Sequence, residues 1–227
     1  MQNMEKNLNR VRARIIEAAR ASGRDPDSIL LLAVSKKKPA SDIRLAYGLG
    51  QRDFGENYLQ EAQQKLRELQ DLDICWHFIG AIQSNKTHSI AEAFDWVHCI
   101  DRVKIARRLS EQRPAGRQPL NVCIQVNLDQ ESSKAGIEPE ALPELAVEIR
   151  DLPGIRLRGL MTIPAPRDTP RQQRIPFARL AEMLSGLRQQ GIDCDTLSMG
   201  MTQDLEAAIA EGSTLVRIGT AIFGERT

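Results

Sequence analysis

Eight short β-rich runs, each followed by a helical pattern, alternate along this chain of 227 residues. At each step the spacing of apolar residues changes from the period of a strand to that of a helix. Strands that alternate with helices build parallel sheets, because a parallel crossover needs a long segment to return the chain to the same edge. The eight runs are 30–35, 52–57, 75–80, 95–100, 120–128, 155–163, 195–199 and 214–219.

Eight strand–helix units predict a single closed (β/α)8 barrel of the TIM type, in a chain slightly shorter than the ~250 residues typical of that fold. An extra N-terminal helix from Asn3 to Ala21 is expected to stand in for a missing eighth helix. No linker rich in glycine, serine or proline divides the chain, and the proline-rich stretch 163–170 is typical of a strand-to-helix loop. One domain over residues 1–227 is therefore expected.

A doubly wound open sheet is the structural alternative. Such sheets usually carry a glycine-rich GxGxxG turn after the first strand, where the backbone approaches a dinucleotide. This chain has Ser-Lys-Lys-Lys-Pro at that place, in residues 35–39. The barrel is the simpler interpretation.

The charge balance argues against several classes of partner. Thirty-one basic and 30 acidic residues leave a formal net charge of +1, so no overall field draws the chain to nucleic acid or to an anionic membrane. No apolar run approaches the ~20 residues that cross a bilayer, and the N-terminus lacks the apolar stretch of a secretory signal. We expect a cytoplasmic protein, and a monomer, with small or local partners.

The cysteines and histidines lack the spacing of common metal sites. No CxxC, HxxxH or HxH pattern occurs, and three of the four cysteines fall inside predicted strands, where a free thiol packs as a small apolar group. The residues are Cys75, Cys99, Cys123, Cys194, His77, His88 and His98. The pattern predicts structural thiols and no metal.

A lysine cluster follows the first strand run, in Leu31-Leu-Ala-Val-Ser-Lys-Lys-Lys-Pro39. In (β/α)8 barrels the chemistry collects on the face where strands end, so Lys36 is expected at the barrel mouth. Desolvation there lowers the pKa of a lysine, and an amine made nucleophilic in this way forms a Schiff base with a carbonyl. The alternative is a solvated basic turn.

The last two strand runs end in small, donor-rich turns. Ser198-Met199-Gly200-Met201 follows the seventh run, and Arg217-Ile218-Gly219-Thr220 closes the eighth. Barrels bind phosphate at this place, because glycine lets backbone N–H groups approach the oxygens and hydroxyls add donors. A helix beginning near Thr202 is expected to add its positive end. Each turn alone is equally consistent with a tight loop.

A phosphate site that faces a Schiff-base lysine across a barrel mouth indicates pyridoxal 5′-phosphate, whose aldehyde and phosphate leave different parts of one ring. Arg217 then faces the pyridine nitrogen. A guanidinium donates hydrogen bonds and stays protonated, so it holds that nitrogen unprotonated and makes the ring a poorer electron sink. A salt bridge at the end of the barrel is the alternative role for Arg217.

Three further residues fall near predicted strand ends and are expected to line the cofactor site. They are Asn57, His77 and Met161. Asn57 is equally suited to cap the second helix of the barrel, and His77 to be a hydrogen-bonded core histidine.

Several blocks of the sequence resemble the pyridoxal-phosphate homeostasis protein family, which is related in fold to the barrel domain of bacterial alanine racemase. The blocks cover nearly the whole chain and include LLAVSKKKP, FGENY, WHFIGAIQSNK, LRGLMTIPAP and LSMGMTQDLEAAIAEGSTLVRIGTAIFG. The resemblance implies that Lys36 forms the Schiff base and that Arg217 is the partner of the ring nitrogen. It also implies phosphate contacts from Ser198, Gly200, Gly219 and Thr220. Lys37 departs from the family pattern, in which a short polar residue is commoner.

The resemblance implies a protein that holds, buffers or transfers pyridoxal phosphate, to apo-enzymes among others, and thereby supports vitamin B6 and amino-acid balance. Alanine racemase uses a tyrosine from a second domain as an acid/base, and we expect no such arrangement here. Two alternatives stay open: a weakly active racemase-like enzyme, and a barrel that binds sugar phosphates without a Schiff base. Lys38 and Lys134 are further candidates for transient cofactor binding.

Overall fold

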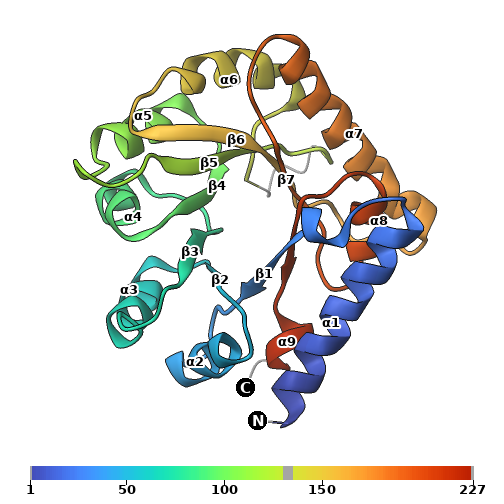
Figure 1. Cartoon of the computed structure of the whole chain (residues 1–227). Helices are drawn as coiled ribbons and strands as arrows, with labels where there is room; N and C mark the ends of the chain where they lie inside the picture. The colour runs from blue at the N-terminus through green and yellow to red at the C-terminus, as the bar shows by residue number, and fades with distance from the viewer. Residues whose placement is uncertain (1, 130–134, 226–227) are drawn as a thin grey trace.

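The computed structural model of the protein describes residues 2–129 and 135–225. Eight parallel strands pair in chain order, and the first also pairs with the last, which closes the sheet into a barrel (Figure 1). The predicted (β/α)8 barrel is confirmed, and the open doubly wound sheet is wrong because the eight described strands leave no edge. The strands are β1 Leu30–Val34, β2 Asp53–Glu56, β3 Cys75–Phe78, β4 Trp96–Ile100, β5 Leu120–Gln125, β6 Ile155–Met161, β7 Thr196–Ser198 and β8 Leu215–Ile218.

A ring of helices surrounds the barrel (Figure 1). The helices that follow the strands are α2 Ala40–Gly48, α3 Leu59–Glu68, α4 Thr87–Ala93, α5 Val103–Glu111, α6 Leu142–Arg150, α7 Pro170–Gln189, α8 Leu205–Ala210 and α9 Thr220–Phe223. The extra N-terminal helix is also present, as α1 Gln2–Ala21, and it packs against α8 and α9. It covers the side of the barrel that α9, with four residues, is too short to cover.

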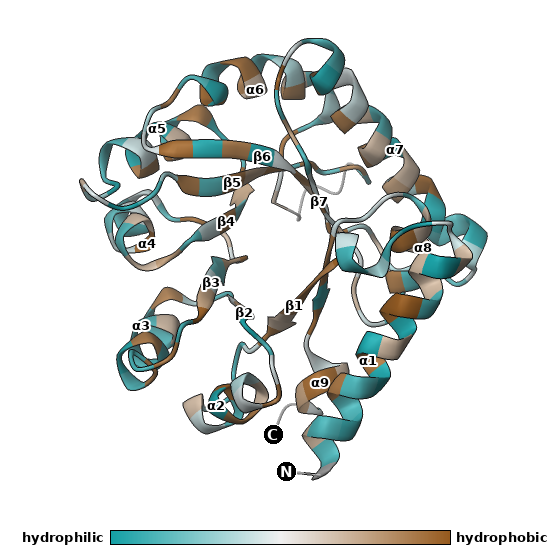
Figure 2. Cartoon of the chain, in the orientation of Figure 1, coloured by the Kyte–Doolittle hydropathy of each residue, from teal (hydrophilic) through white to brown (hydrophobic). Residues whose placement is uncertain are grey.

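The hydrophobic core lies mainly between the strands and the helices. Along β6 the buried Ile155 and Leu157 alternate with the exposed Arg156 and the half-buried Arg158, which Figure 2 shows as alternating brown and teal. The helix α5 contributes Ile105 and Leu109, both fully buried, on one face. Burial of apolar surface of this kind supplies roughly 25 cal/mol per Å² and fixes the helices around the sheet.

Helix α7 has a capped N-terminus. It starts at Pro170, with Thr169 as its N-cap, and the Thr169 hydroxyl accepts a hydrogen bond from the N–H of Gln172. Proline is favoured in the first turn, where its missing N–H has no partner to lose. The proline-rich stretch before the helix is the predicted loop between β6 and α7. None of the helices in the described part of the chain combines the length and hydropathy required to cross a membrane.

Candidate cofactor-binding site

Lys36 lies at the carboxyl end of β1, in the turn that leads to α2. Its side chain is half-buried, whereas the adjacent Ser35 is fully buried and Lys37 is exposed. Lys37 has a φ of 60°, in the left-handed region of backbone conformation that residues other than glycine rarely adopt. The neighbouring Lys38 directs its Nζ away, to the carbonyl oxygen of Glu225 at 2.8 Å.

A buried ionic cluster holds this turn from behind. The Ser35 hydroxyl donates to Glu56 Oε1 at 2.6 Å, and Lys65 Nζ donates to the Ser35 carbonyl oxygen at 2.8 Å. Lys65 also bonds to Glu56 Oε1 at 2.7 Å and to Glu61 Oε1 at 2.6 Å. Glu61 in turn accepts a hydrogen bond from the N–H of Lys37. The residues on both sides of Lys36 are therefore fixed by α3 and β2.

The charge of Glu56 is incompletely compensated. Its side chain is fully buried, and its Oε2 has no hydrogen-bond partner among the described residues. Burial raises the pKa of Glu56, although Lys65 and Ser35 oppose this effect.

Arg217 on β8 is buried inside the barrel and is held by three hydrogen bonds. Its Nη1 donates to the Ser198 carbonyl oxygen at 2.6 Å and to the Ser198 Oγ at 2.8 Å, and its Nη2 donates to the Thr162 carbonyl oxygen at 2.8 Å. Burial lowers the pKa of Arg217 to about 10, so the guanidinium stays charged at neutral pH. Both acceptor residues lie at the ends of β6 and β7, which orients the guanidinium relative to the mouth.

The turns after β7 and β8 form a cup of backbone donors. Gly200 has a φ of 97°, and an added Cβ would lie 2.6 Å from the Cβ of Ala208, so only glycine fits. The N–H groups of Gly200 and Gly219 meet no hydrogen-bond acceptor within the described part of the chain. Thr220 is exposed at the start of α9. Such free donors suit an anion.

The side chains of Ser198, the last residue of β7, and of Met199, which follows it, are buried and do not face the cup. The hydroxyl of Ser198 is fully buried against Arg217 and against His98, whose Nδ1 lies 2.8 Å from the Ser198 Oγ. Met199 packs in the core between the strands and helices. The helix expected near Thr202 begins at Leu205 instead, after a turn.

Asn57 and Met161 lie at the strand ends, as expected. Asn57 follows β2 directly, and its Oδ1 is buried without a partner among the described residues. It does not cap α3, whose N-cap residue is Tyr58. Met161 is the last residue of β6 and packs with Cys99 and Cys123.

His77 lies inside the barrel rather than at its mouth. Its Nε2 is 3.1 Å from Asp53 Oδ1, and its Nδ1 is 3.0 Å from the Nε2 of His98. A chain of hydrogen bonds therefore runs from Asp53 through both histidines to Ser198 and Arg217. Burial holds the pKa of His98 well below its usual value, so this imidazole is neutral.

The sequence did not predict a role in the site for His98, for Thr162 or for the cluster of Glu56 with Lys65. A signal was present for His98, because a polar residue inside an otherwise apolar strand run usually has a buried partner. Lys65 gave no signal, since a lysine in a helix is ordinarily solvated. Lys134 lies outside the described residues.

These features fit pyridoxal phosphate on the observations of this structure alone. The cup supplies free N–H donors for a phosphate, Arg217 supplies a fixed cationic donor, and Lys36 supplies an amine. Because β1 pairs with β8, Lys36 and the cup lie on neighbouring strands: an added Cβ at Gly219 would lie 3.2 Å from the carbonyl oxygen of Val34.

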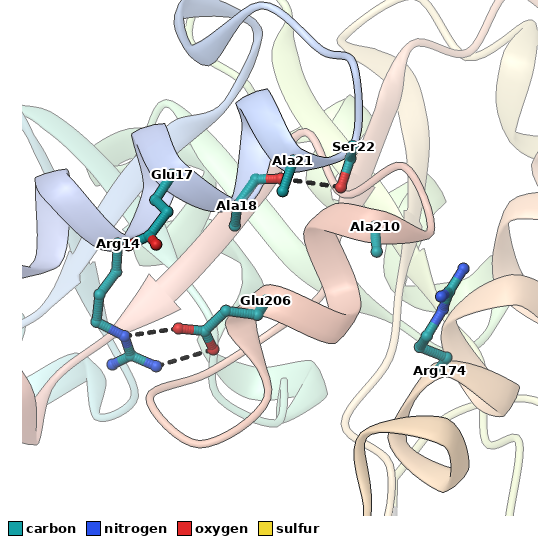
Figure 3. Close-up of a pocket in the computed structure, with 8 residues that line it drawn as sticks. All are labelled: Arg14, Glu17, Ala18, Ala21, Ser22, Arg174, Glu206 and Ala210. Atoms are coloured by element: carbon teal, nitrogen blue, oxygen red, sulfur yellow. Dashed lines mark hydrogen bonds and ion pairs between the residues drawn. The ribbon is translucent and has the colours of Figure 1, made fainter.

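A large hollow lies elsewhere, between α1, α8 and α7 (Figure 3). It has a volume of about 630 Å³. Arg14 crosses it to form paired hydrogen bonds with Glu206, at 2.7 and 2.9 Å (Figure 3). No residue of the predicted site lines this hollow. It lies between outer helices and is therefore no candidate for the cofactor site.

Comparison with known proteins gives consistent results. The family described as alanine racemase, N-terminal domain, matches residues 1–227. The pyridoxal phosphate homeostasis proteins of Pseudomonas aeruginosa and Escherichia coli K12 are 60% and 53% identical to this chain. The matches span 100% of this chain and 97% and 98% of those proteins. The structure of PipY from Synechococcus elongatus PCC7942 with PLP bound superposes with a TM-score of 0.86 at 37% identity, and it covers 97% of this chain and 100% of PipY.

Proposed function

The chain belongs to the alanine racemase N-terminal domain family and, within it, to the pyridoxal phosphate homeostasis proteins, and we propose that the mouth of its barrel holds the cofactor. The protein binds pyridoxal phosphate at the carboxyl ends of the strands and holds, buffers or transfers it, which supports vitamin B6 and amino-acid homeostasis.

The observation that carries this proposal is the fixed guanidinium of Arg217, held inside the barrel whose mouth carries Lys36 and the donor cup. The three hydrogen bonds from Arg217 to Ser198 and Thr162 leave no freedom for the guanidinium to follow a ligand. A preoriented donor of this kind fits a ring nitrogen that accepts a hydrogen bond and receives no proton.

Each residue has a separate task in the proposed site. Lys36 forms the Schiff base with the aldehyde, and the turn that carries Lys36 is held by Ser35 and Lys37. The N–H groups of Gly200 and Gly219, with the Thr220 hydroxyl, bind the phosphate. Ser198 and Met199 support the cup from behind, and Asn57 and Met161 line the mouth. His77 acts through His98 and Ser198. When bound, the cofactor supplies a reactive aldehyde and an electron-accepting ring.

The proposed carrier role follows from a pyridine nitrogen that accepts a hydrogen bond from Arg217 and stays unprotonated. Carbanion chemistry on amino acids is strongest when the ring is a good electron sink, and an arginine partner weakens that property. We propose that the protein acts in the cytoplasm as a monomer and passes its cofactor to apo-enzymes. The four free cysteines, three of them buried, are consistent with a reducing compartment.

The test is to load the protein with pyridoxal phosphate, remove free cofactor by gel filtration, and follow two reactions in parallel. Transfer is measured as activity gained by an apo-enzyme that depends on pyridoxal phosphate, with trapping of free cofactor as the control. Turnover is measured with each common amino acid. We expect transfer without sustained turnover. Steady racemisation that is lost in Lys36→Ala would contradict the carrier role and favour the enzyme.

A further inference from the structure

A second hollow lies at the opposite end of the barrel, where the strands begin. It has a volume of about 280 Å³. The residues that line it include Leu30, Asp53, His77, Trp96, Arg158 and Asp195. The proposed cofactor site uses none of its wall directly and reaches His77 only through His98, so this end of the barrel needs its own explanation.

Three side chains of different chemistry converge beside this hollow. His77 Nε2 lies 3.1 Å from Asp53 Oδ1 and 3.4 Å from Cys75 Sγ, and the three potential ligand atoms all lie within 4.8 Å of one another. Tetrahedral zinc has bonds of about 2.0 Å to oxygen, 2.0–2.1 Å to nitrogen and 2.3 Å to sulfur. Those bonds separate neighbouring ligand atoms by about 3.3–3.6 Å, which is close to the two distances measured here.

The barrel itself brings the three residues together. Cys75 and His77 are two positions apart on β3, so their side chains point to the same face of the strand. Asp53 pairs with Cys75 across β2 and β3 in the register of the sheet. A Cys-x-His spacing on a strand, with a carboxylate on the next strand, is thus a geometric motif that a search for CxxC or HxxxH does not detect.

The surroundings hold the histidine as a metal ligand is usually held. A ligating imidazole donates its second N–H to a fixed acceptor, and His77 Nδ1 lies 3.0 Å from His98 Nε2. The ring of His77 also stacks on Trp96, with centroids 5.5 Å apart and planes inclined by 8°. The Nε2 atom is therefore directed at Asp53 and Cys75 by two independent contacts.

The local charge also favours a cation. The carboxylates of Asp73 and Asp95 lie near the cluster and add negative charge beside that of Asp53. The same negative potential attracts a divalent ion. The nearby Arg158 does not cancel it, because its guanidinium is paired with Asp195 at 2.6 and 2.9 Å.

We propose that Asp53, Cys75 and His77 form a binding site for a divalent transition-metal ion of the zinc class. The ligand set of carboxylate, thiolate and imidazole suits Zn²⁺ and excludes the hard ions that need oxygen ligands throughout. Binding replaces the thiol S–H bond by a metal–sulfur bond, and the proton leaves to solvent. The imidazole binds through Nε2, with the proton on Nδ1 directed at His98 Nε2. Three protein ligands leave a fourth position, which a water molecule from the hollow fills.

The test uses the full chain, with and without pyridoxal phosphate, and Co²⁺ as a spectroscopic probe for Zn²⁺. Thiolate coordination gives a charge-transfer band in the near ultraviolet, and tetrahedral Co²⁺ gives strong visible bands. The matched variants are Cys75→Ser and Cys194→Ser, because Cys194 is another free thiol and precedes β7 at the same end of the barrel. Asp53→Asn keeps the shape of the side chain and removes its charge. Circular dichroism confirms that each variant folds.

We expect one Co²⁺ per chain with both spectral features, displaced by Zn²⁺. Cys75→Ser should abolish the charge-transfer band, and Asp53→Asn should weaken Zn²⁺ binding at least tenfold, whereas Cys194→Ser should change neither. A spectrum of hexahydrated Co²⁺ alone would overturn the proposal, as would a charge-transfer band that persists in folded Cys75→Ser. These results do not depend on the cofactor, so their failure leaves the proposed function intact.

Discussion

Arg217 combines a full charge with full burial, and its surroundings explain how the barrel tolerates this. A buried charge is stable only when hydrogen bonds replace its hydration. The two carbonyl oxygens and the hydroxyl that accept from Arg217 do so without neutralising it. The arginine therefore remains a cationic donor inside the barrel, which is what the proposed contact with a ring nitrogen requires.

Arg217→Lys should lower the free energy of unfolding by about 2 kcal/mol, because an ammonium cannot reach Ser198 and Thr162 in the fork geometry and at least one charged hydrogen bond is lost. Urea unfolding without cofactor measures this. Arg107→Lys is the matched control, since Arg107 forms an exposed pair with Glu148 at 2.9 Å. We expect that control to change stability by less than about 1 kcal/mol. Equal losses of unfolding free energy in the two variants would show that these hydrogen bonds do not fix the guanidinium of Arg217.

Thr220→Ala should weaken binding of pyridoxal phosphate about tenfold and leave binding of pyridoxal nearly unchanged. A charge-assisted hydrogen bond contributes about 1.5–3 kcal/mol, and only the phosphate would receive it. Ser198→Ala should affect both ligands alike, because the Ser198 hydroxyl contacts Arg217 and His98. Absorbance titrations of the two ligands separate these cases. A loss for Thr220→Ala that is equal with both ligands would place the phosphate elsewhere.

The turn between β1 and α2 is held by β2 and α3, through Glu56, Lys65 and Glu61. An exposed loop would leave Lys36 free to sample many positions. Here the residues before and after it are tied to a buried ionic cluster, so the cost of ordering the turn is met on folding rather than on cofactor binding.

The pH dependence of stability tests whether burial or the charge of Lys65 has the larger effect on the pKa of Glu56. Because the pKa of Glu56 is raised above 4.5 in the folded protein, the folded state binds its proton more tightly than the unfolded chain does. The stability advantage of the wild type over Glu56→Gln should therefore shrink as the pH rises from about 4.5 toward 7. Urea unfolding of both proteins across this range measures the difference. An advantage that grows with pH would mean that Lys65 depresses the pKa instead.

The alternation of strands and helices was sufficient to predict the barrel, because each strand–helix unit carries its own periodicity. The sequence also predicted that Lys36 and the turns at Gly200 and Gly219 would share the mouth, since parallel strands end on one face. It left His77 open between the mouth and a hydrogen-bonded core position, and the core position, which the structure shows, depends on the register of β3 against β2 and β4. The buried cluster around Lys65 depends on a helix-to-strand contact that no local pattern encodes.

At the scale of the whole molecule, closure of the barrel is what assembles the site. Lys36 is separated from the cup by more than 160 positions in the sequence, yet β1 pairs directly with β8. The α1 helix packs against α8 and α9 at this same seam (Figure 1). The N-terminal helix therefore stabilises the junction that brings the amine beside the phosphate donors.

Borohydride reduction of the cofactor-loaded protein, followed by digestion and mass spectrometry, locates the lysine that carries the cofactor. We predict a phosphopyridoxyl group on Lys36 and its loss in Lys36→Ala, whereas Lys38→Ala should keep it, because the Lys38 amine bonds to the Glu225 carbonyl oxygen. Fresh wild-type protein labelled mainly on Lys38 or Lys134, or carrying no label after loading, would contradict the central claim that the mouth of this barrel binds pyridoxal phosphate through Lys36.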